Sequence, residues 1–265
     1  MQGQGSAGAG GSDLVSAAAL ELDRAERTRV GIQPWSTQGH RLTSEAAWAV
    51  AAARDRLRAE RGAVHTGYKL GWTSQAMREA LGIDRPNFGT LWDYMRVEDG
   101  GTLDLARLIH PKVEPELAFL ADATLDGPGV TADEVLESGR WAVALEIVDP
   151  RWASYDFDWF DNTADGSSAA AYVVGAFRRA PVRPESLRLT MQAGEISREG
   201  SGDAAMGSPA EAVAYLVRQL HERGEALRPG LVVLTGGITA PLDLTAGATV
   251  RVSSPELGSC HLHCR

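Results

Sequence analysis

The segment HPKVEPELAF, residues 110–119, constrains the fold more than any other part of the chain. Residues 113–119 are typical of a β-strand, in which side chains point alternately to the two faces. Glu114 and Glu116 therefore share one face, and the apolar residues beside them share the other. Neighbouring carboxylates repel each other, and burying them without a partner costs several kcal/mol. This face of the strand therefore needs a positively charged partner.

A third acid, Glu146, lies in the apolar run WAVALEIVDP, residues 141–150. Three acids embedded in two apolar strands favour a bound divalent cation, because Mg²⁺ and Mn²⁺ prefer oxygen ligands. The alternative is that lysine side chains neutralise the acids, and Lys69 or Lys112 could do so. The spacing of the residues leaves both interpretations open.

Three other motifs each allow a functional and a structural interpretation. Lys69 lies between glycines in GYKLG. It is either a surface lysine or, if a metal is bound nearby, a side chain that binds negative charge or transfers a proton. The segment TADGSSAAAYVVG, residues 163–175, contains a turn that could present hydroxyl and N–H groups to a ligand. The segment LTGGITAP, residues 234–241, is either a tight turn or a place where the backbone approaches a ligand closely.

Periodicity and capping residues predict an α+β protein with a mostly antiparallel or mixed sheet. The expected N-caps are Ser44, Ser74 and Ser208, the last followed by Pro209. Helices are expected at residues 12–31, 43–62, 74–83, 131–139 and 208–223. Strands are expected within residues 65–74 and at 112–121, 142–149, 170–178, 186–193, 231–235 and 248–252. We expect a disordered tail at 1–12, a helical segment at 13–100, and a β-rich catalytic core at 101–265 that forms one unit with that segment.

Composition argues against several classes of function. The formal net charge of −9 and the lack of a basic run argue against nucleic-acid binding. The sequence contains no run of 18 or more apolar residues, so no membrane span is predicted. The Gly/Ser-rich start does not resemble a signal peptide. We therefore expect a cytoplasmic protein that acts on a small molecule.

Both cysteines lie in the C-terminal segment CHLHCR, as Cys260 and Cys264. Two cysteines are too few for a disulfide framework. Two cysteines and two histidines this close together cannot easily surround one tetrahedral zinc ion. A terminal strand is therefore expected here.

The chain resembles a known family in six segments that occur in the same order. They are GYKLGWTSQAMREALGIDRPNFGTL, HPKVEPELAF, ALEIVD, ADGSSAAAYVVG, GSGDAAMGSPAEAVAYL and LRPGLVVLTGGIT. The family is that of the 2-keto-4-pentenoate hydratases and 4-oxalocrotonate decarboxylases, which have the fumarylacetoacetate-hydrolase-like fold. The resemblance covers about residues 40–255 and is specific to the family, but it does not decide the reaction.

The resemblance implies a set of site residues. It implies that an E-x-E pair and a later glutamate, here Glu114, Glu116 and Glu146, bind Mg²⁺ or Mn²⁺, which chelates the 1-carboxylate and 2-oxo group of an unsaturated 2-oxo acid. Lys69 corresponds to the family's active-site lysine. The implied substrate-binding residues are Trp72, Asp165, Ser167, Ser168, Thr235 and Gly236. A homo-oligomer is also implied, as is association with a partner enzyme of the same pathway.

Two departures from the family pattern bear on the reaction. Hydratases carry an aspartate where this chain has Asn87, in RPNFG, and asparagine cannot act as a general base. The family's D-N-x-S segment appears here as residues 165–168, DGSS, without the amide. The proline between the two metal-binding glutamates resembles the decarboxylase branch. Trp72 and Trp92 stand where smaller apolar residues are common, which suggests a reshaped pocket.

We therefore predict metal-dependent decarboxylation of an unsaturated 2-oxo dicarboxylic acid of the 2-oxo-3-hexenedioate type, through a metal-stabilised dienolate. Asn87 and Lys69 are the predicted catalytic positions. The alternatives are hydration of 2-hydroxypenta-2,4-dienoate, a biosynthetic reaction of another 2-oxo acid, and a catalytically silent partner of a true enzyme.

Overall fold

The structure, a computed structural model, describes residues 7–180 and 182–265. Its helices are α1 (Ala7–Thr28), α2 (Ser44–Glu60), α3 (Gln75–Leu81), α4 (Ala132–Glu137), α5 (Trp159–Ala164) and α6 (Pro209–His221). The first sheet has the strand order β2 (Asn87–Trp92), β1 (His65–Gly71), β9 (Val232–Leu234), β4 (Lys112–Ala121), β5 (Gly139–Val148) and β6 (Ala169–Val174), and β10 (Leu242–Asp243) pairs with β4. The second sheet has the order β3 (Thr102–Leu103), β12 (Gly258–Cys264), β11 (Thr249–Ser254), β7 (Arg188–Ala193) and β8 (Ile196–Ser201).

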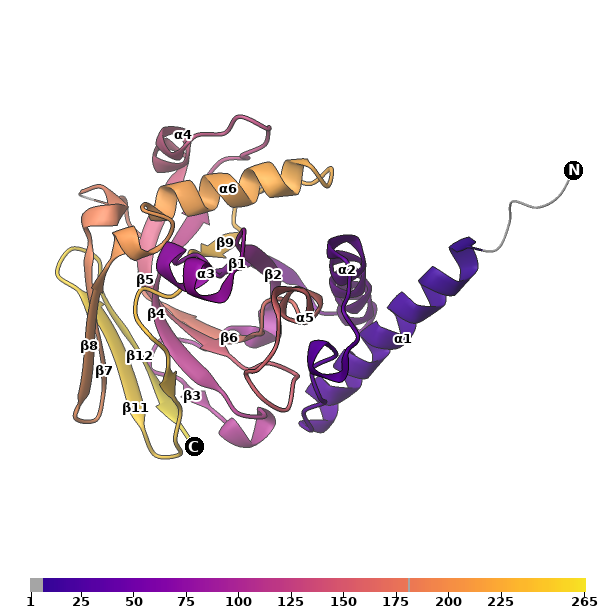
Figure 1. The fold of residues 1–265 in the computed structure, drawn as a ribbon. Helices are drawn as coiled ribbons and strands as arrows, with labels where there is room; N and C mark the ends of the chain where they lie inside the picture. The colour runs from indigo at the N-terminus through magenta and orange to yellow at the C-terminus, as the bar shows by residue number, and fades with distance from the viewer. Residues whose placement is uncertain (1–6, 181) are drawn as a thin grey trace, which may run out of the picture.

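Most neighbouring strands run antiparallel, but β1 is parallel to β9 and β12 is parallel to β3. The expected mixed sheet and α+β class are therefore confirmed. Apolar side chains from both sheets form one core cluster, to which α6 also contributes a face. In Figure 1, α6 and α4 lie together across the upper end of the sheets. The amphipathic pattern of α6 explains this position, because one side of the helix is buried along its length.

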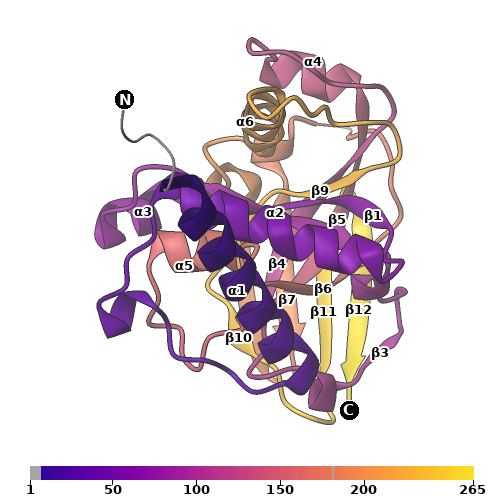
Figure 2. The same ribbon diagram turned by 90° about the vertical axis from the view of Figure 1, so that its right-hand side faces the viewer.

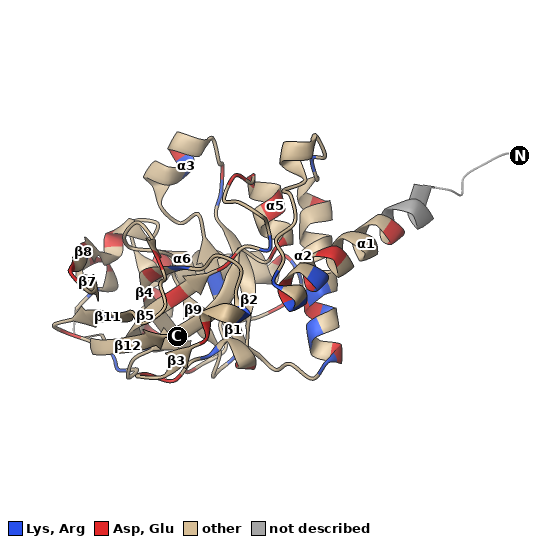
Figure 3. Ribbon diagram, turned by 90° about the horizontal axis from the view of Figure 1, so that it is seen from below, with Lys and Arg blue, Asp and Glu red and all other residues tan. Residues whose placement is uncertain are grey.

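A separate layer is formed by α1, α2 and α5. Figure 2 shows α1 and α2 crossing in front of the sheets. Apolar residues of α1 and α2 form a cluster of their own with Trp152 and Ala164. Both signs of charge are distributed along α1 and α2 (Figure 3).

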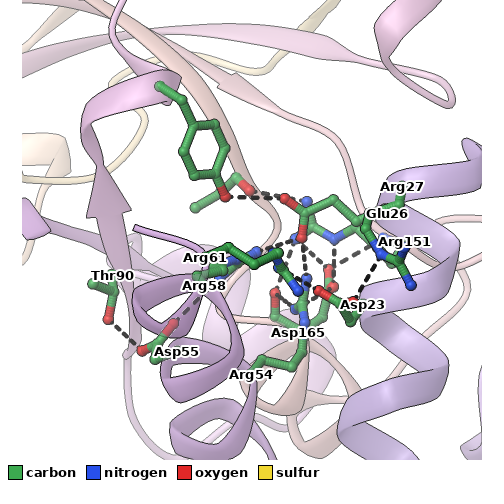
Figure 4. A network of polar contacts seen from close by, with 12 residues as sticks. Asp23, Glu26, Arg27, Arg54, Asp55, Arg58, Arg61, Thr90, Arg151 and Asp165 are labelled. Atoms are coloured by element: carbon green, nitrogen blue, oxygen red, sulfur yellow. Dashed lines mark hydrogen bonds and ion pairs between the residues drawn. The ribbon is translucent and has the colours of Figure 1, made fainter. Parts of the chain in front are cut away.

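Ion pairs join these two helices where their charged faces meet (Figure 4). Arg54 and Arg58 of α2 each donate a 2.7 Å hydrogen bond to Glu26 of α1. Arg61, just beyond α2, contacts Asp23 of α1 at 2.6 Å. The first helix is therefore held to the rest of the molecule by charge as well as by apolar packing.

The N-terminal boundaries differ from those expected. Helix α1 begins at Ala7 rather than Ser12, so residues 7–12 of the expected tail are helical, and residues 1–6 lie outside the described residues. Ser12 therefore lies within the helix and not at its N-cap. Helix α2 is capped by the Thr43 side chain, which accepts from the Ala46 N–H, and not by Ser44. The expected caps Ser74 and Ser208 do precede α3 and α6.

The expected strands are present with ends shifted by a few residues, and CHLHCR lies in β12 as expected. The strands β2, β3, β8 and β10 and the helix α5 were not expected. The strand β8 is short and mostly exposed, so it lacks the apolar alternation by which strands are recognised. No helix in the described part of the chain combines the length and hydrophobicity needed to cross a bilayer.

Candidate metal centre and active site

The three predicted metal ligands lie side by side on one face of the first sheet. In the antiparallel pair β4–β5, Glu114 is directly opposite Glu146, and Glu116 is opposite Ala144. Directly opposed residues project to the same face, which is why the period-two spacing brings all three acids together. One carboxylate oxygen from each glutamate lies within 4.8 Å of the others.

These acids are buried without enough partners. Glu116 and Glu146 are 0% and 1% exposed. Glu116 Oε2 accepts a 2.8 Å hydrogen bond from the Gly236 N–H, but Glu116 Oε1 and both Glu146 oxygens accept none. Glu146 Oε1 has an ion-pair contact with Lys69 at 3.1 Å, whereas Glu116 Oε1 and Glu146 Oε2 have no partner. Buried polar atoms almost always have partners, so these two carboxylate oxygens point to a missing positive charge. A set of three hard oxygen donors fits a divalent cation such as Mg²⁺ or Mn²⁺.

The electrostatics of the protein alone agree with this fit. Burial, together with the charge of Glu146, raises the pKa of Glu114 to about 7 and raises the pKa of Glu116 well above its usual range. Part of the Glu114 side chain remains accessible from the cavity described below. A bound dication would remove the repulsion that causes much of these shifts.

Lys69 is brought to the same face by β1. It pairs with Leu234 of β9, which pairs in turn with Ala118, two residues beyond Glu116. The Lys69 ammonium lies 3.1 Å from Glu146 Oε1 and donates to the carbonyl oxygen of Ser167 at 2.8 Å. Burial lowers the pKa of Lys69, but the three glutamates outweigh it and the net shift is upward.

The ion-pair alternative therefore accounts for only part of the negative charge. Lys69 supplies one ammonium against three carboxylates. Lys112 contributes nothing here, because its ammonium contacts Asp243 on the surface at 2.7 Å. A bound divalent cation would balance the remaining charge.

A cavity of about 400 Å³ lies in front of the acids. Within the described residues, its charged wall groups are Lys69 and Glu114. Hydroxyl and amide groups come from Thr73, Ser74, Tyr155, Asn162, Ser167, Ser168 and Thr239. Much of the remaining wall is apolar, from Leu70, Trp72, Met77, Val148, Phe157, Ala204, Ile238, Ala240 and Pro241. The arrangement suits a small substrate with an anionic end near the acids and lysine.

Asn87 is fully buried and is not part of the cavity wall. Its amide nitrogen donates to Asn162 Oδ1 at 2.8 Å, and its oxygen accepts from Ser167 Oγ at 2.9 Å. The indole N–H of Trp72, which can only donate, also contacts Asn162 Oδ1 at 2.9 Å. This donor fixes the orientation of both amides. Asn87 therefore acts behind Ser167 and holds it in place.

Asn162 was not among the residues expected at the site. It lies in α5, a helix too short to be recognised by periodicity, and it links Trp72, Asn87 and Ser168. Two of these partners, Trp72 and Asn87, lie 90 and 75 residues away in the sequence, so the role of Asn162 is visible only in the structure.

The turn after α5 has an unusual backbone. Gly166, Ser167 and Ser168 have φ angles of 71°, 56° and 59°. These values lie in the left-handed region, which residues other than glycine rarely adopt. Both serines line the cavity as predicted. Strained turns of this kind are common where side chains must be aimed at a ligand.

Asp165 lies apart from the other predicted substrate-binding residues. It is fully buried, and its Oδ1 accepts from Arg54 at 3.1 Å and from Arg151 at 2.6 Å. Figure 4 shows this carboxylate among the guanidinium groups that connect the helices to the sheet. Its position anchors the beginning of the strained turn.

Thr235 and Gly236 are placed behind the acids. Thr235 is buried and donates to the carbonyl of Leu117 at 2.9 Å, away from the cavity. Gly236 has a φ of 106°, and a Cβ there would overlap the Thr73 side chain. The next residue, Gly237, lines the cavity, and a Cβ at this position would lie 2.9 Å from the Glu114 carboxylate carbon. The two glycines thus allow the backbone to approach the acids closely.

The two tryptophans predicted to reshape the pocket have different positions. Trp72 lines the cavity, as predicted, whereas Trp92 is buried in a cluster on another part of the sheet and lines a different cavity. Cys260 and Cys264 are buried on the inner side of β12. Among the described residues, one group of acidic, histidine or cysteine side chains is close enough together to hold a metal ion, and it is the trio of Glu114, Glu116 and Glu146.

Curated proteins of similar sequence carry two activities. The chain is 34% identical over 252 residues to 4-oxalocrotonate decarboxylase from Pseudomonas putida, covering 93% of this chain and 95% of that protein. It is 36% identical over 220 residues to 2-keto-4-pentenoate hydratase from Burkholderia vietnamiensis, covering 80% and 83% of the two chains. No family model matches the sequence.

Solved structures give the same relationship. The fold matches 4-oxalocrotonate decarboxylase from Pseudomonas putida G7, complexed with magnesium and adipate, with a TM-score of 0.91 and 31% identity over 96% of this chain and 98% of that one. A fumarylacetoacetate hydrolase family protein from Yersinia pestis has a TM-score of 0.58 at 13% identity, over 76% of this chain and 94% of that one. The second match concerns the fold alone and confirms the expected fumarylacetoacetate-hydrolase-like architecture.

Proposed function

The chain belongs to the family of the 4-oxalocrotonate decarboxylases and 2-keto-4-pentenoate hydratases, and on this premise we propose that it decarboxylates an unsaturated 2-oxo dicarboxylic acid of the 2-oxo-3-hexenedioate type. The observation that carries the proposal is the trio of Glu114, Glu116 and Glu146, whose unpartnered oxygens lie beside Lys69 at a cavity of about 400 Å³.

Glu114, Glu116 and Glu146 would hold one divalent cation, Mg²⁺ or Mn²⁺. Support comes from their hard oxygen donors and from the magnesium in the related decarboxylase structure. A cation bound there supplies positive charge next to the 2-oxo group, where negative charge develops as the carbon–carbon bond breaks.

Lys69 binds the anionic end of the substrate and supplies a proton. Among the described residues that line the cavity, Lys69 carries the positively charged side chain. The upward shift of its pKa keeps the ammonium group protonated. As CO₂ leaves, the bonding electron pair moves through the double bond toward the 2-oxo oxygen. A proton must then be returned to the product, and the Lys69 ammonium is placed to donate it.

The distal carboxylate of the substrate would meet an apolar wall that includes Met77, Phe157 and Ile238. An apolar wall disfavours the charged carboxylate and favours neutral CO₂. Support for decarboxylation over hydration comes from Asn87, since an amide cannot activate water and this one lies behind Ser167. Hydration of 2-hydroxypenta-2,4-dienoate is the alternative, because curated relatives also carry that activity.

The test is to offer the purified protein 2-oxo-3-hexenedioate and 2-hydroxypenta-2,4-dienoate, each with saturating Mg²⁺. Loss of ultraviolet absorbance and release of CO₂ give kcat/KM for each substrate. We expect kcat/KM for decarboxylation to exceed that for hydration by about 10²-fold or more, the usual contribution of one positioned acid or base. Efficient hydration without CO₂ release would assign the protein to the hydratases instead.

We also propose that the protein is a cytoplasmic homo-oligomer that associates with an enzyme of the same pathway. Support for self-association comes from α1, which leaves Leu14 and Leu20 exposed along its length. Light scattering at several protein concentrations tests the subunit number, and a monomer at all concentrations would refute self-association.

A further inference from the structure

We propose that Trp72 determines the length of the substrate by closing the catalytic cavity off from a second cavity. The inference rests on the proposed function, because it concerns the far end of the same 2-oxo acid. The second cavity has a volume of about 520 Å³, larger than the catalytic one. If the two were joined, the site would accept a chain several carbons longer.

The two cavities share two wall residues, Trp72 and Phe157. Trp72 follows β1 directly, three residues after Lys69, so it lies at the edge of the catalytic machinery. Phe157 comes from the opposite side, in the segment before α5. Two aromatic side chains common to both walls form the partition between the spaces.

Trp72 is held in an unusual conformation. Its φ angle is 59°, and a bulky residue in the left-handed region is rare unless its surroundings enforce it. The indole N–H donates to Asn162 Oδ1 at 2.9 Å. Arg78 of α3 donates to the carbonyl oxygens of Trp72 and Thr73 at 2.7 and 2.9 Å. The indole is therefore held by α5, and the backbone of Trp72 is held by α3.

The chemistry of the second cavity suits an extended diacid. Apolar wall groups come from Leu81, Ile83, Trp159 and Phe160. Two arginines stand over aromatic rings in this wall: Arg41 lies 5.2 Å from the centre of the Phe160 ring, and Arg85 lies 5.1 Å from the Trp159 ring. Arg85 also donates to Ser44, whereas Arg41 contacts Asp158 at 3.4 Å. The wall also carries three carboxylates, from Asp84, Asp156 and Asp158, and Asp158 is the partner of Arg41. A longer methylene chain ending in a carboxylate would find apolar surface and then the guanidinium group of Arg85, which forms no ion pair within the described residues.

The test uses binding rather than turnover, so that its failure can be distinguished from failure of the proposed function. Saturated 2-oxo diacids of six, eight and ten carbons are titrated calorimetrically into the Mg²⁺-loaded protein, with pyruvate as a ligand that reaches only the metal centre. The variants are Trp72→Gly, which suits the backbone conformation, and Trp72→Phe, which keeps an aromatic wall. Met77→Ala is the matched control, because Met77 lines the catalytic cavity alone.

We expect the native protein, Trp72→Phe and Met77→Ala to bind the six-carbon diacid most tightly. Trp72→Gly should bind the eight-carbon diacid about tenfold more tightly than the native protein does, as burial of two additional methylene groups implies. Its affinity for pyruvate should stay within about twofold of native. If the glycine variant does not fold, Trp72→Leu replaces it, and this variant should also bind the eight-carbon diacid more tightly than the native protein does.

Equal affinity of the native protein for all three diacids would overturn the proposal, as would an unchanged length preference in the folded Trp72 variants. An equal gain in Met77→Ala would also overturn it, since the gain would then reflect volume alone. Should the native protein bind diacids in this order but release no CO₂ from the enedioate, the proposed function fails and the role of Trp72 stands.

Discussion

Lys69 and Asn87 lie at different depths relative to the cavity, and this difference separates their roles. Both were predicted at catalytic positions. Lys69 lines the cavity, whereas Asn87 is separated from it by Ser167. A residue type indicates what chemistry is available, but only the packing around it shows which atoms it can reach.

Replacing Lys69 with methionine keeps the apolar stem and removes the charge. We expect turnover of the Mg²⁺-loaded enzyme to fall by about 10²-fold or more, as for loss of a positioned acid. The melting temperature measured with Mg²⁺ should change by only a few degrees, because a bound cation balances Glu146. A large loss of stability with normal activity per folded molecule would assign Lys69 to the fold.

The change Asn87→Asp replaces a donor with an acceptor. The Trp72 N–H fixes Asn162 Oδ1 as an acceptor, so the new carboxylate oxygen would face it where the amide now donates at 2.8 Å. We expect a loss of about 1–3 kcal/mol in the free energy of unfolding and no gain in hydration. Denaturant unfolding and hydratase assays check both, and a stable variant with raised hydratase activity would contradict this account.

At the scale of elements, the register of β4 against β5 brings the three glutamates together, and the turn after α5 contributes Ser167 and Ser168 to the cavity wall. The turn starts at Asp165, whose carboxylate contacts Arg54 of α2 and Arg151 at 3.1 and 2.6 Å. The two guanidinium groups are almost completely buried. The helical layer therefore supports the serines of the active site through one carboxylate.

The substitution Asp165→Asn should destabilise the protein strongly. It removes the carboxylate that contacts the buried Arg151 and leaves the buried Arg54 with Glu26 alone, a loss of about 3–5 kcal/mol. The matched control is Asp23→Asn, because the partners of Asp23 are solvent-exposed arginines, Arg27 and Arg61, whose pairs contribute about 1 kcal/mol or less. Equal melting temperatures of the two variants would show that the Asp165 network has no special structural role.

At the scale of the whole molecule, α1 is held to the body partly by charge. Burial raises the pKa of Glu26, but the guanidinium groups of Arg58, Arg54 and Arg151 outweigh it and hold this pKa far below its usual range. A carboxyl group with a lowered folded-state pKa stabilises the protein fully above its unfolded-state pKa, here 4.5, and progressively less below it.

The expected result is a stability gap between the native protein and Glu26→Gln that depends on pH. The gap should be largest at pH 6–7, roughly two units above the unfolded-state pKa, and should narrow as the pH falls below 4.5. Thermal unfolding of both proteins from pH 3 to pH 7 measures it. A gap that is constant over this range would mean that Glu26 titrates normally in the folded protein.

The fold class and the clustering of the three glutamates could be predicted because they depend on local patterns. Alternation places Glu114 and Glu116 on one face, and the apolar run around Glu146 shows that this acid also lies in a strand. The roles of Asp165 and Asn162 could not be predicted, because their partners lie up to 111 residues away in the sequence. Short elements such as α5 also carry too few residues for periodicity to be visible.

The central claim is that three glutamates hold one divalent cation, and calorimetric titration with Mg²⁺ tests it most directly. We predict one Mg²⁺ per native chain and an affinity at least about tenfold weaker in each of Glu114→Gln, Glu116→Gln and Glu146→Gln, with turnover falling in parallel. The control Asp243→Asn removes an exposed acid near the same strand and should leave Mg²⁺ affinity unchanged. Unchanged Mg²⁺ affinity in all three glutamine variants would contradict the account.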